Sequence, residues 1–241
     1  MTLGEGATSR DGETPDRPGL ASLRTAVLYS EEVGIGLAAG NDRELFKWFL
    51  ASTLYGARIS ETIARATYRA FERHRLLDPR AILRAGRDFL IGTVMAEGGY
   101  VRYDHQRSDQ LLRNATTLLD EYGGSLKRLH RRASDAQDLE GRLQRFHGVG
   151  PVTANIFLRE LRPVWAKADP EPLPVVVESA GCLGVNLAAL DRKSWEFCRV
   201  EAGLIRWRHG GRRRRRTGGG RGDGGPGGGS DNFAGGSGEA V

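Results

Sequence analysis

A short glycine-containing segment, His147-Gly148-Val149-Gly150, has the residue types needed to bind a phosphate group. Helical patterns precede and follow it, so it predicts a tight turn between two helices. Glycine allows close approach of a second backbone, and free amides at a helix N-terminus bind phosphate without reading a base. Pro151 suits the first position of the second helix. We therefore expect phosphate contact at these four residues and at the adjacent Val152 and Thr153, although His147 also fits a plain surface histidine.

Asp169 is the next residue with the chemistry of a site. It precedes Pro170, an arrangement typical of a helix start, where the helix dipole favours an ionised carboxylate. The same pattern also fits an aspartate that only caps the helix.

The segment Leu143–Asp169, LQRFHGVGPVTANIFLRELRPVWAKAD, resembles the helix-hairpin-helix of the endonuclease III and alkyl-adenine glycosylase superfamily of DNA-repair enzymes. Asn41–Phe71 resembles the family's first core helix, its base-pocket loop and the helix after it. Gly98–Leu126 resembles the turn and long helix before the hairpin. The resemblance covers about residues 41–185. It implies an all-α glycosylase fold that binds double-stranded DNA with a damaged or mismatched base, flips that base out and hydrolyses its glycosidic bond.

The resemblance also assigns roles to individual residues. Asp169 fits the place of the catalytic aspartate, and Glu178 is the alternative if residues were inserted before it. Such a carboxylate stabilises positive charge on the sugar and orients the attacking water. A flipped base needs an aromatic side chain to hold it, and Tyr55 and Tyr103 are the candidates. Both tyrosines also fit a packing role.

Two departures from the family pattern limit the chemistry. Val152 stands where bifunctional members carry a nucleophilic lysine, so we expect a monofunctional glycosylase without strand cleavage. The alternative is a non-catalytic helix-hairpin-helix protein that only binds DNA. Cys182 and Cys198 are the only cysteines and cannot supply a four-cysteine iron–sulfur cluster, so we expect no cluster, no metal site and two buried, inert thiols. The resemblance leaves room for a monovalent cation at the hairpin carbonyls.

Composition points to a globular chain with a basic character. The 241 residues are 39% hydrophobic and carry a net charge of +6, and only four of the 36 basic residues are lysines. Arginine suits bidentate contact with phosphate, although a general arginine bias explains the same count. With no apolar run of membrane-spanning length and no leader, we expect a cytoplasmic protein. The resemblance to DNA-repair enzymes implies association with the nucleoid, and we expect a monomer.

Helical periodicity fills the middle of the chain, and strand-like alternation is nearly absent. We expect disorder over residues 1–20, a helical domain over 21–209 with its hairpin at 138–161, and a disordered Arg/Gly-rich tail over 210–241. Within that tail, Arg212, Arg213 and Arg214 are candidate DNA contacts. A solvated tail, or an RNA-binding or assembly role centred on it, is the alternative.

Overall fold

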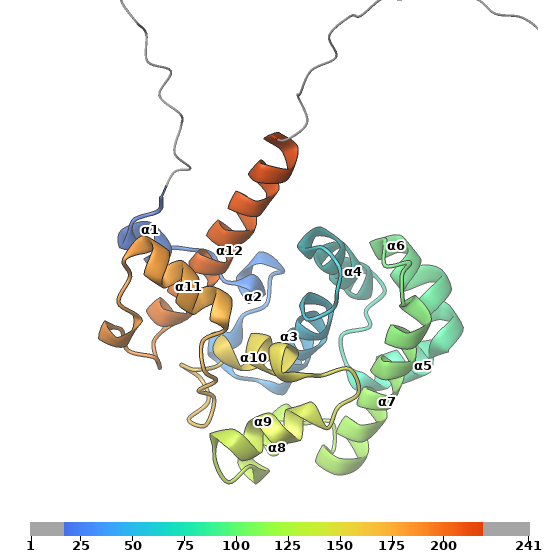
Figure 1. The fold of residues 1–241 in the computed structure, drawn as a ribbon. Helices are drawn as coiled ribbons and strands as arrows, with labels where there is room; N and C mark the ends of the chain where they lie inside the picture. Colours follow the sequence, from blue (N-terminus) through green and yellow to red (C-terminus); the bar gives the residue numbers. More distant parts are fainter. Residues whose placement is uncertain (1–16, 219–241) are drawn as a thin grey trace, which may run out of the picture.

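The computed structural model describes residues 17–218, and side chains up to Gly210. This part of the chain is helical and contains no strand, which confirms the predicted all-α class (Figure 1). The helices, in chain order, are α1 (Leu20–Arg24), α2 (Tyr29–Glu32), η1 (Leu37–Ala39), α3 (Asp42–Tyr55), α4 (Glu61–Arg73), α5 (Pro79–Phe89), the π-helical η2 (Leu90–Met95), α6 (Ala96–Gly98), α7 (Asp104–Tyr122), α8 (Leu126–Arg132), α9 (Ala136–Gln144), α10 (Pro151–Arg159), α11 (Pro174–Leu183), η3 (Leu187–Ala189) and α12 (Trp195–Gly218). None of them has an apolar stretch that could cross a membrane.

Local sequence signals account for several helix starts. The Ser60 side chain accepts the amide of Ile63 at the start of α4, and Asp78 accepts the amide of Ala81 at the start of α5. The hairpin was predicted over residues 138–161. Its first helix begins two residues earlier, at Ala136, because Asp135 is its N-cap.

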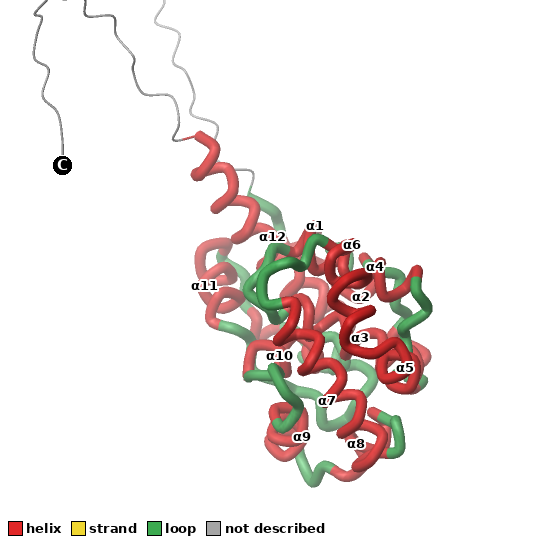
Figure 2. Tube along the Cα trace, turned by 90° about the vertical axis from the view of Figure 1, so that its right-hand side faces the viewer, coloured by secondary structure: helices red, strands yellow, loops and turns green. Residues whose placement is uncertain are grey.

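The central helix α3 packs against α4 on one side and against α10 on the other (Figure 1). α5 pairs with α7 at one end of the molecule, and α11 and α12 pair at the other. The N-terminal α1 packs against α12, so segments from both ends of the described chain lie together (Figures 1 and 2). The Trp48 indole in α3 donates to the Phe157 carbonyl of α10 at 3.0 Å, which fixes the hairpin against the core.

Both predicted domain ends need correction. Arg17 donates to the Cys182 carbonyl at 2.9 Å, and α1 begins at Leu20, so residues 17–20 belong with the helical domain. At the other end α12 continues to Gly218, beyond the boundary predicted at residue 210. The arginine run prolongs the helix because arginine is a good helix former, despite the adjacent glycines. Residues 1–16 and 219–241 lie outside the described residues.

Substitution of Gly98 tests the contact between α6 and α4. A Cβ at Gly98 would overlap the Cα of Thr67, which is backbone and cannot rotate away. We expect Gly98→Ala to lower the free energy of unfolding by about 1–3 kcal/mol, as overpacking does. Gly92→Ala is the control, because open space surrounds that position, and alanine should leave the protein equally or more stable. Urea denaturation measures both, and equal stabilities would contradict this packing.

Candidate nucleic-acid interface

Helix α7 holds the hairpin turn in place through Asn114. The Asn114 amide donates to the His147 carbonyl at 2.9 Å, and the His147 amide donates to Asn114 Oδ1 at 2.7 Å. One buried side chain therefore satisfies both backbone groups of the first turn residue. This pairing fixes where the turn sits relative to α7.

Gly148 is required in the turn for two reasons. Its φ of +72° lies in the left-handed region, which favours glycine. A Cβ there would also overlap the side-chain amide of Gln110 on α7. The close approach predicted for the hairpin glycines thus occurs at Gly148, and its neighbour is a side chain of α7.

The turn presents backbone amides to solvent at the start of α10. Gly148 and Gly150 are exposed and their amides have no partner among the described residues, whereas the His147 amide is taken up by Asn114. No side chain caps α10 at Gly150. Val152, the residue in place of the family lysine, is 51% exposed. This geometry fits the expected phosphate cradle, because uncapped helix amides favour an anion.

Two residues of the segment predicted to contact phosphate have buried side chains. Val149 is 5% exposed and Thr153 is 4% exposed. Thr153 packs directly beneath Gly56, where an added Cβ would lie 3.0 Å from the Thr153 Cβ. The side chains of Val149 and Thr153 therefore anchor the hairpin in the core, and the predicted phosphate contact at these residues stays a prediction for their backbone.

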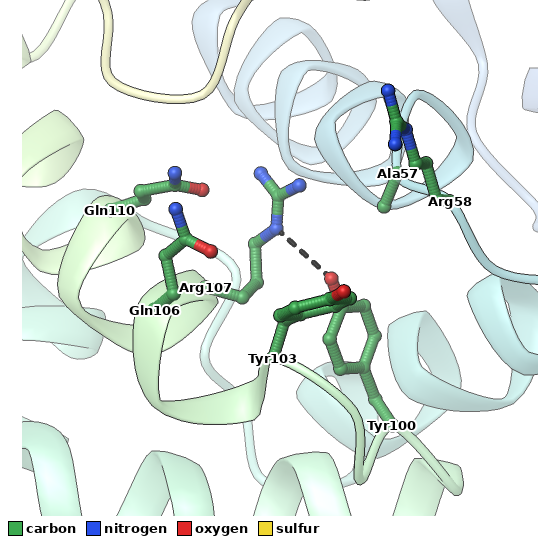
Figure 3. Close-up of a pocket in the computed structure, with 7 residues that line it drawn as sticks. All are labelled: Ala57, Arg58, Tyr100, Tyr103, Gln106, Arg107 and Gln110. Carbon is green, nitrogen blue, oxygen red and sulfur yellow. Dashed lines mark hydrogen bonds between the residues drawn. The ribbon is translucent and has the colours of Figure 1, made fainter.

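A pocket of about 230 Å³ lies next to the hairpin, between α7 and the loop that follows α3 (Figure 3). Its walls come from Ala57 and Arg58 on that loop, from Tyr100 and Tyr103 just before α7, and from Gln106, Arg107 and Gln110 in the first turns of α7. Gln110 belongs to both features, since it lines the pocket and touches Gly148. The pocket and the hairpin therefore form one continuous surface.

Arg107 is the least exposed charged group of the pocket, at 9%. Its Nε donates to the Tyr100 hydroxyl at 3.4 Å, while Nη1 is buried without a hydrogen-bond partner (Figure 3). Tyr103 is 54% exposed and has a φ of +64°. The Arg102 guanidinium lies 5.0 Å above the Tyr103 ring and donates to its hydroxyl.

The two predicted base-pocket tyrosines occupy different environments. Tyr103 lines the pocket, whereas Tyr55 packs into the core, with its ring 5.4 Å from Tyr29 and 6.4 Å from Trp48. Burial raises the pKa of the Tyr55 hydroxyl, which has no hydrogen-bond partner. The sequence placed Tyr55 on the loop after α3, but this residue is the last of that helix and its side chain turns inward.

Asp169 is held by two arginines. Its Oδ1 accepts a hydrogen bond from Arg192 Nε at 2.9 Å and lies 3.4 Å from Arg162 Nε, and the side chain is 35% exposed. The expected position at a helix N-terminus is wrong, because α11 begins only at Pro174. Prolines at alternate positions, 170, 172 and 174, keep this segment out of the helical region, since a residue before proline disfavours it.

Glu178, the alternative acid, lies in the middle of α11. Its side chain is 61% exposed and lies 3.4 Å from Arg208. Neither Glu178 nor Asp169 lines the pocket next to the hairpin.

The cysteines and other metal-ligating residues show no metal centre within residues 17–210. Cys198 is buried, with its Sγ 3.0 Å from the Arg159 carbonyl, and burial raises the pKa of its thiol to about 12. Cys182 is exposed, which corrects the expectation of two buried thiols, because it lies on the outer side of α11. Arg212, Arg213 and Arg214 continue α12, and their side chains lie outside the described residues.

The polar face of α7 was not predicted as part of the site, apart from Tyr103. Tyr103, Arg107, Gln110 and Asn114 recur at spacings of three and four residues, so they share one face of the helix. The prediction for this helix rested on its apolar residues, which define the side that faces the core. The polar repeat was the available signal for the pocket.

The chain was compared with protein-family models, with curated proteins and with solved structures, and none of the three comparisons found a match.

Alanine at the two hairpin glycines tests the geometry of the turn. Gly148→Ala should lower the free energy of unfolding by about 1–2 kcal/mol through its left-handed backbone alone, and further because Gln110 must move. Gly150→Ala meets open space at a φ of −91°, so it should stay within about 0.5 kcal/mol of wild type. Chemical denaturation measures both. Adding Gln110→Ala should restore part of the loss in Gly148→Ala, and no restoration would contradict the contact.

Proposed function

We propose that this protein binds double-stranded DNA through the exposed amides of its hairpin and accepts an unpaired, flipped nucleotide in the adjoining pocket. The observation that carries the proposal is the continuity of the two features through Gln110. A phosphate on the turn places the neighbouring nucleotide beside the pocket. The resemblance to helix-hairpin-helix glycosylases supports the same assignment.

The charges around the site support a DNA partner. Arg58, Arg102 and Arg107 surround the pocket, and the residues that line it include no carboxylate. Tyr103 offers an exposed ring on which a base could stack, and the Gln106 and Gln110 amides can donate and accept hydrogen bonds. Positive charge beside a neutral amide cradle favours a phosphate backbone.

Hydrolysis of a glycosidic bond is the second candidate function. The observation in its favour is that Asp169 keeps a partly exposed carboxylate on the segment that follows the second hairpin helix. Against it, the same carboxylate is paired with Arg192 and lies near Arg162. Both guanidinium groups neutralise the negative charge that would otherwise stabilise the positively charged sugar. DNA binding is therefore the leading proposal, and base excision is tested separately.

A negative charge at the hairpin tests DNA binding. We expect Val152→Glu to weaken the affinity for duplex DNA by about tenfold, because the new carboxylate faces the phosphate that the amides bind. The fold should be unaffected or slightly stabilised, since an acid in the first turn favours a helix. Val177→Glu is the matched control, with the same charge change at a 55% exposed valine of α11.

Fluorescence anisotropy at several salt concentrations measures this binding. Wild type and Val177→Glu should bind alike and lose affinity as salt rises. Equal affinity of Val152→Glu and Val177→Glu would overturn the hairpin as the binding element.

A panel of lesion-bearing duplexes tests the hydrolase. Duplexes with alkylated, deaminated, oxidised or mismatched bases are incubated with the protein and then treated with or without hot alkali. If Asp169 acts on the sugar, alkali-dependent cleavage should fall about 10²–10³-fold in Asp169→Asn while DNA affinity stays unchanged. Glu178→Gln is the comparison, and a loss confined to that variant would instead assign Glu178. No cleavage of any duplex by wild type would exclude base excision for this panel and leave binding as the function.

A further inference from the structure

We propose that the pocket between Arg58 and Arg107 is a binding site for a phosphate group. The inference deepens the DNA-binding function proposed above, because a DNA phosphodiester is one source of that group. A free phosphate compound, such as a nucleotide, is the other. The chemistry on the pocket walls is the same for both.

The first observation is the state of the Arg107 guanidinium. It is 9% exposed, its one hydrogen bond to a described group is the 3.4 Å contact with Tyr100, and Nη1 has no partner. A buried charge without a counter-ion costs free energy, so proteins normally pair such a group. Arg162, which is also buried, illustrates that rule through its ion pair with Glu201. Arg107 differs because it has no such ion pair within residues 17–210 and its residue lines an open pocket (Figure 3).

The second observation is the composition of the pocket walls. Arg58 lies on the opposite wall, on the loop after α3, and the glutamines and tyrosines supply further hydrogen-bond donors (Figure 3). A guanidinium matches the oxygens of a phosphate in two parallel hydrogen bonds. Two guanidinium groups with amides and hydroxyls match the oxygens of a phosphate, because an arginine side chain only donates hydrogen bonds and phosphate oxygens accept them.

The pocket and the hairpin turn share one residue, Gln110. Gln110 contacts Gly148 on one side and lines the pocket on the other. A phosphate bound beside Gln110 would therefore be only one side chain away from the hairpin turn. This predicts two separate anion contacts on one surface, one made by backbone amides and one by arginine side chains.

Inorganic phosphate and the full-length chain provide the test. Phosphate should raise the melting temperature of wild type, whereas acetate at equal ionic strength should not. The ³¹P signal of phosphate should broaden when wild type is added. Arg107→Met should weaken phosphate binding by about tenfold or more, the worth of a charge-assisted hydrogen bond. Without phosphate the same variant should melt about 2–4 °C higher, because it removes an unpaired buried charge and keeps the apolar stem. If Arg107 only stabilised the fold, Arg107→Met would instead lower the melting temperature.

Two exposed arginines complete the set of variants. Arg58→Gln leaves the core untouched and should weaken phosphate binding, while Arg113→Gln, at an exposed position of α7 outside the pocket walls, should not. The proposal is overturned if folded Arg107→Met and Arg58→Gln bind phosphate as wild type does, or if acetate gives the same effects as phosphate.

Duplex DNA and a deoxynucleoside monophosphate distinguish the two sources. If the ligand is a backbone phosphate, Arg107→Met should reduce the salt slope of DNA binding by about one, and Arg113→Gln should not. If the slope is unchanged but the monophosphate binds in an Arg107-dependent way, the ligand is a free phosphate compound. If wild type binds phosphate but no DNA, the proposed function fails while this inference stands.

Discussion

The guanidinium of Arg162 joins the end of α10, the proline-rich segment after it and the distant helix α12. It is fully buried, forms an ion pair with Glu201 of α12, donates to the carbonyls of Arg159 and Pro170, and lies 4.9 Å above the Phe197 ring. Removing either charge of such a pair leaves the other uncompensated in the interior. The end of α10, the proline-rich segment after it and α12 must therefore keep this arrangement together.

The neighbouring Glu160 extends this constraint to the N-terminal helices. Its two carboxylate oxygens accept the amides of Tyr29 and Ser30 at 2.9 and 3.0 Å, so a residue just after α10 caps α2. Glu160 is fully buried, and desolvation raises its pKa although Arg159 and the two amides oppose that change. The end of the second hairpin helix thus organises both chain ends, while its beginning forms the hairpin surface.

Helix α7 connects that core to the candidate site. Its apolar residues, such as Leu111 and Leu118, are buried in the core. Its polar face supplies Asn114 to the hairpin turn, Gln110 to Gly148 and Arg107 to the pocket. Packing of the apolar face fixes the position of the polar face. Tyr103 begins the polar face with a left-handed backbone, which turns the chain into the helix beside the pocket.

The sequence by itself determined the helical class, the caps at Ser60 and Asp78, and the turn at Gly148, because these depend on local periodicity, capping and backbone freedom. It could not determine which polar groups meet. Asp169 has the pattern of a helix cap, but its pairing with Arg192 depends on how a distant segment folds back. Tyr55 and Thr153 were candidates for contact with DNA, yet the Tyr55 ring packs against Tyr29 and Trp48, and Thr153 is buried beside Gly56. The Arg107 pocket likewise exists only where the loop after α3 faces α7, since burial and pairing are properties of the assembled core.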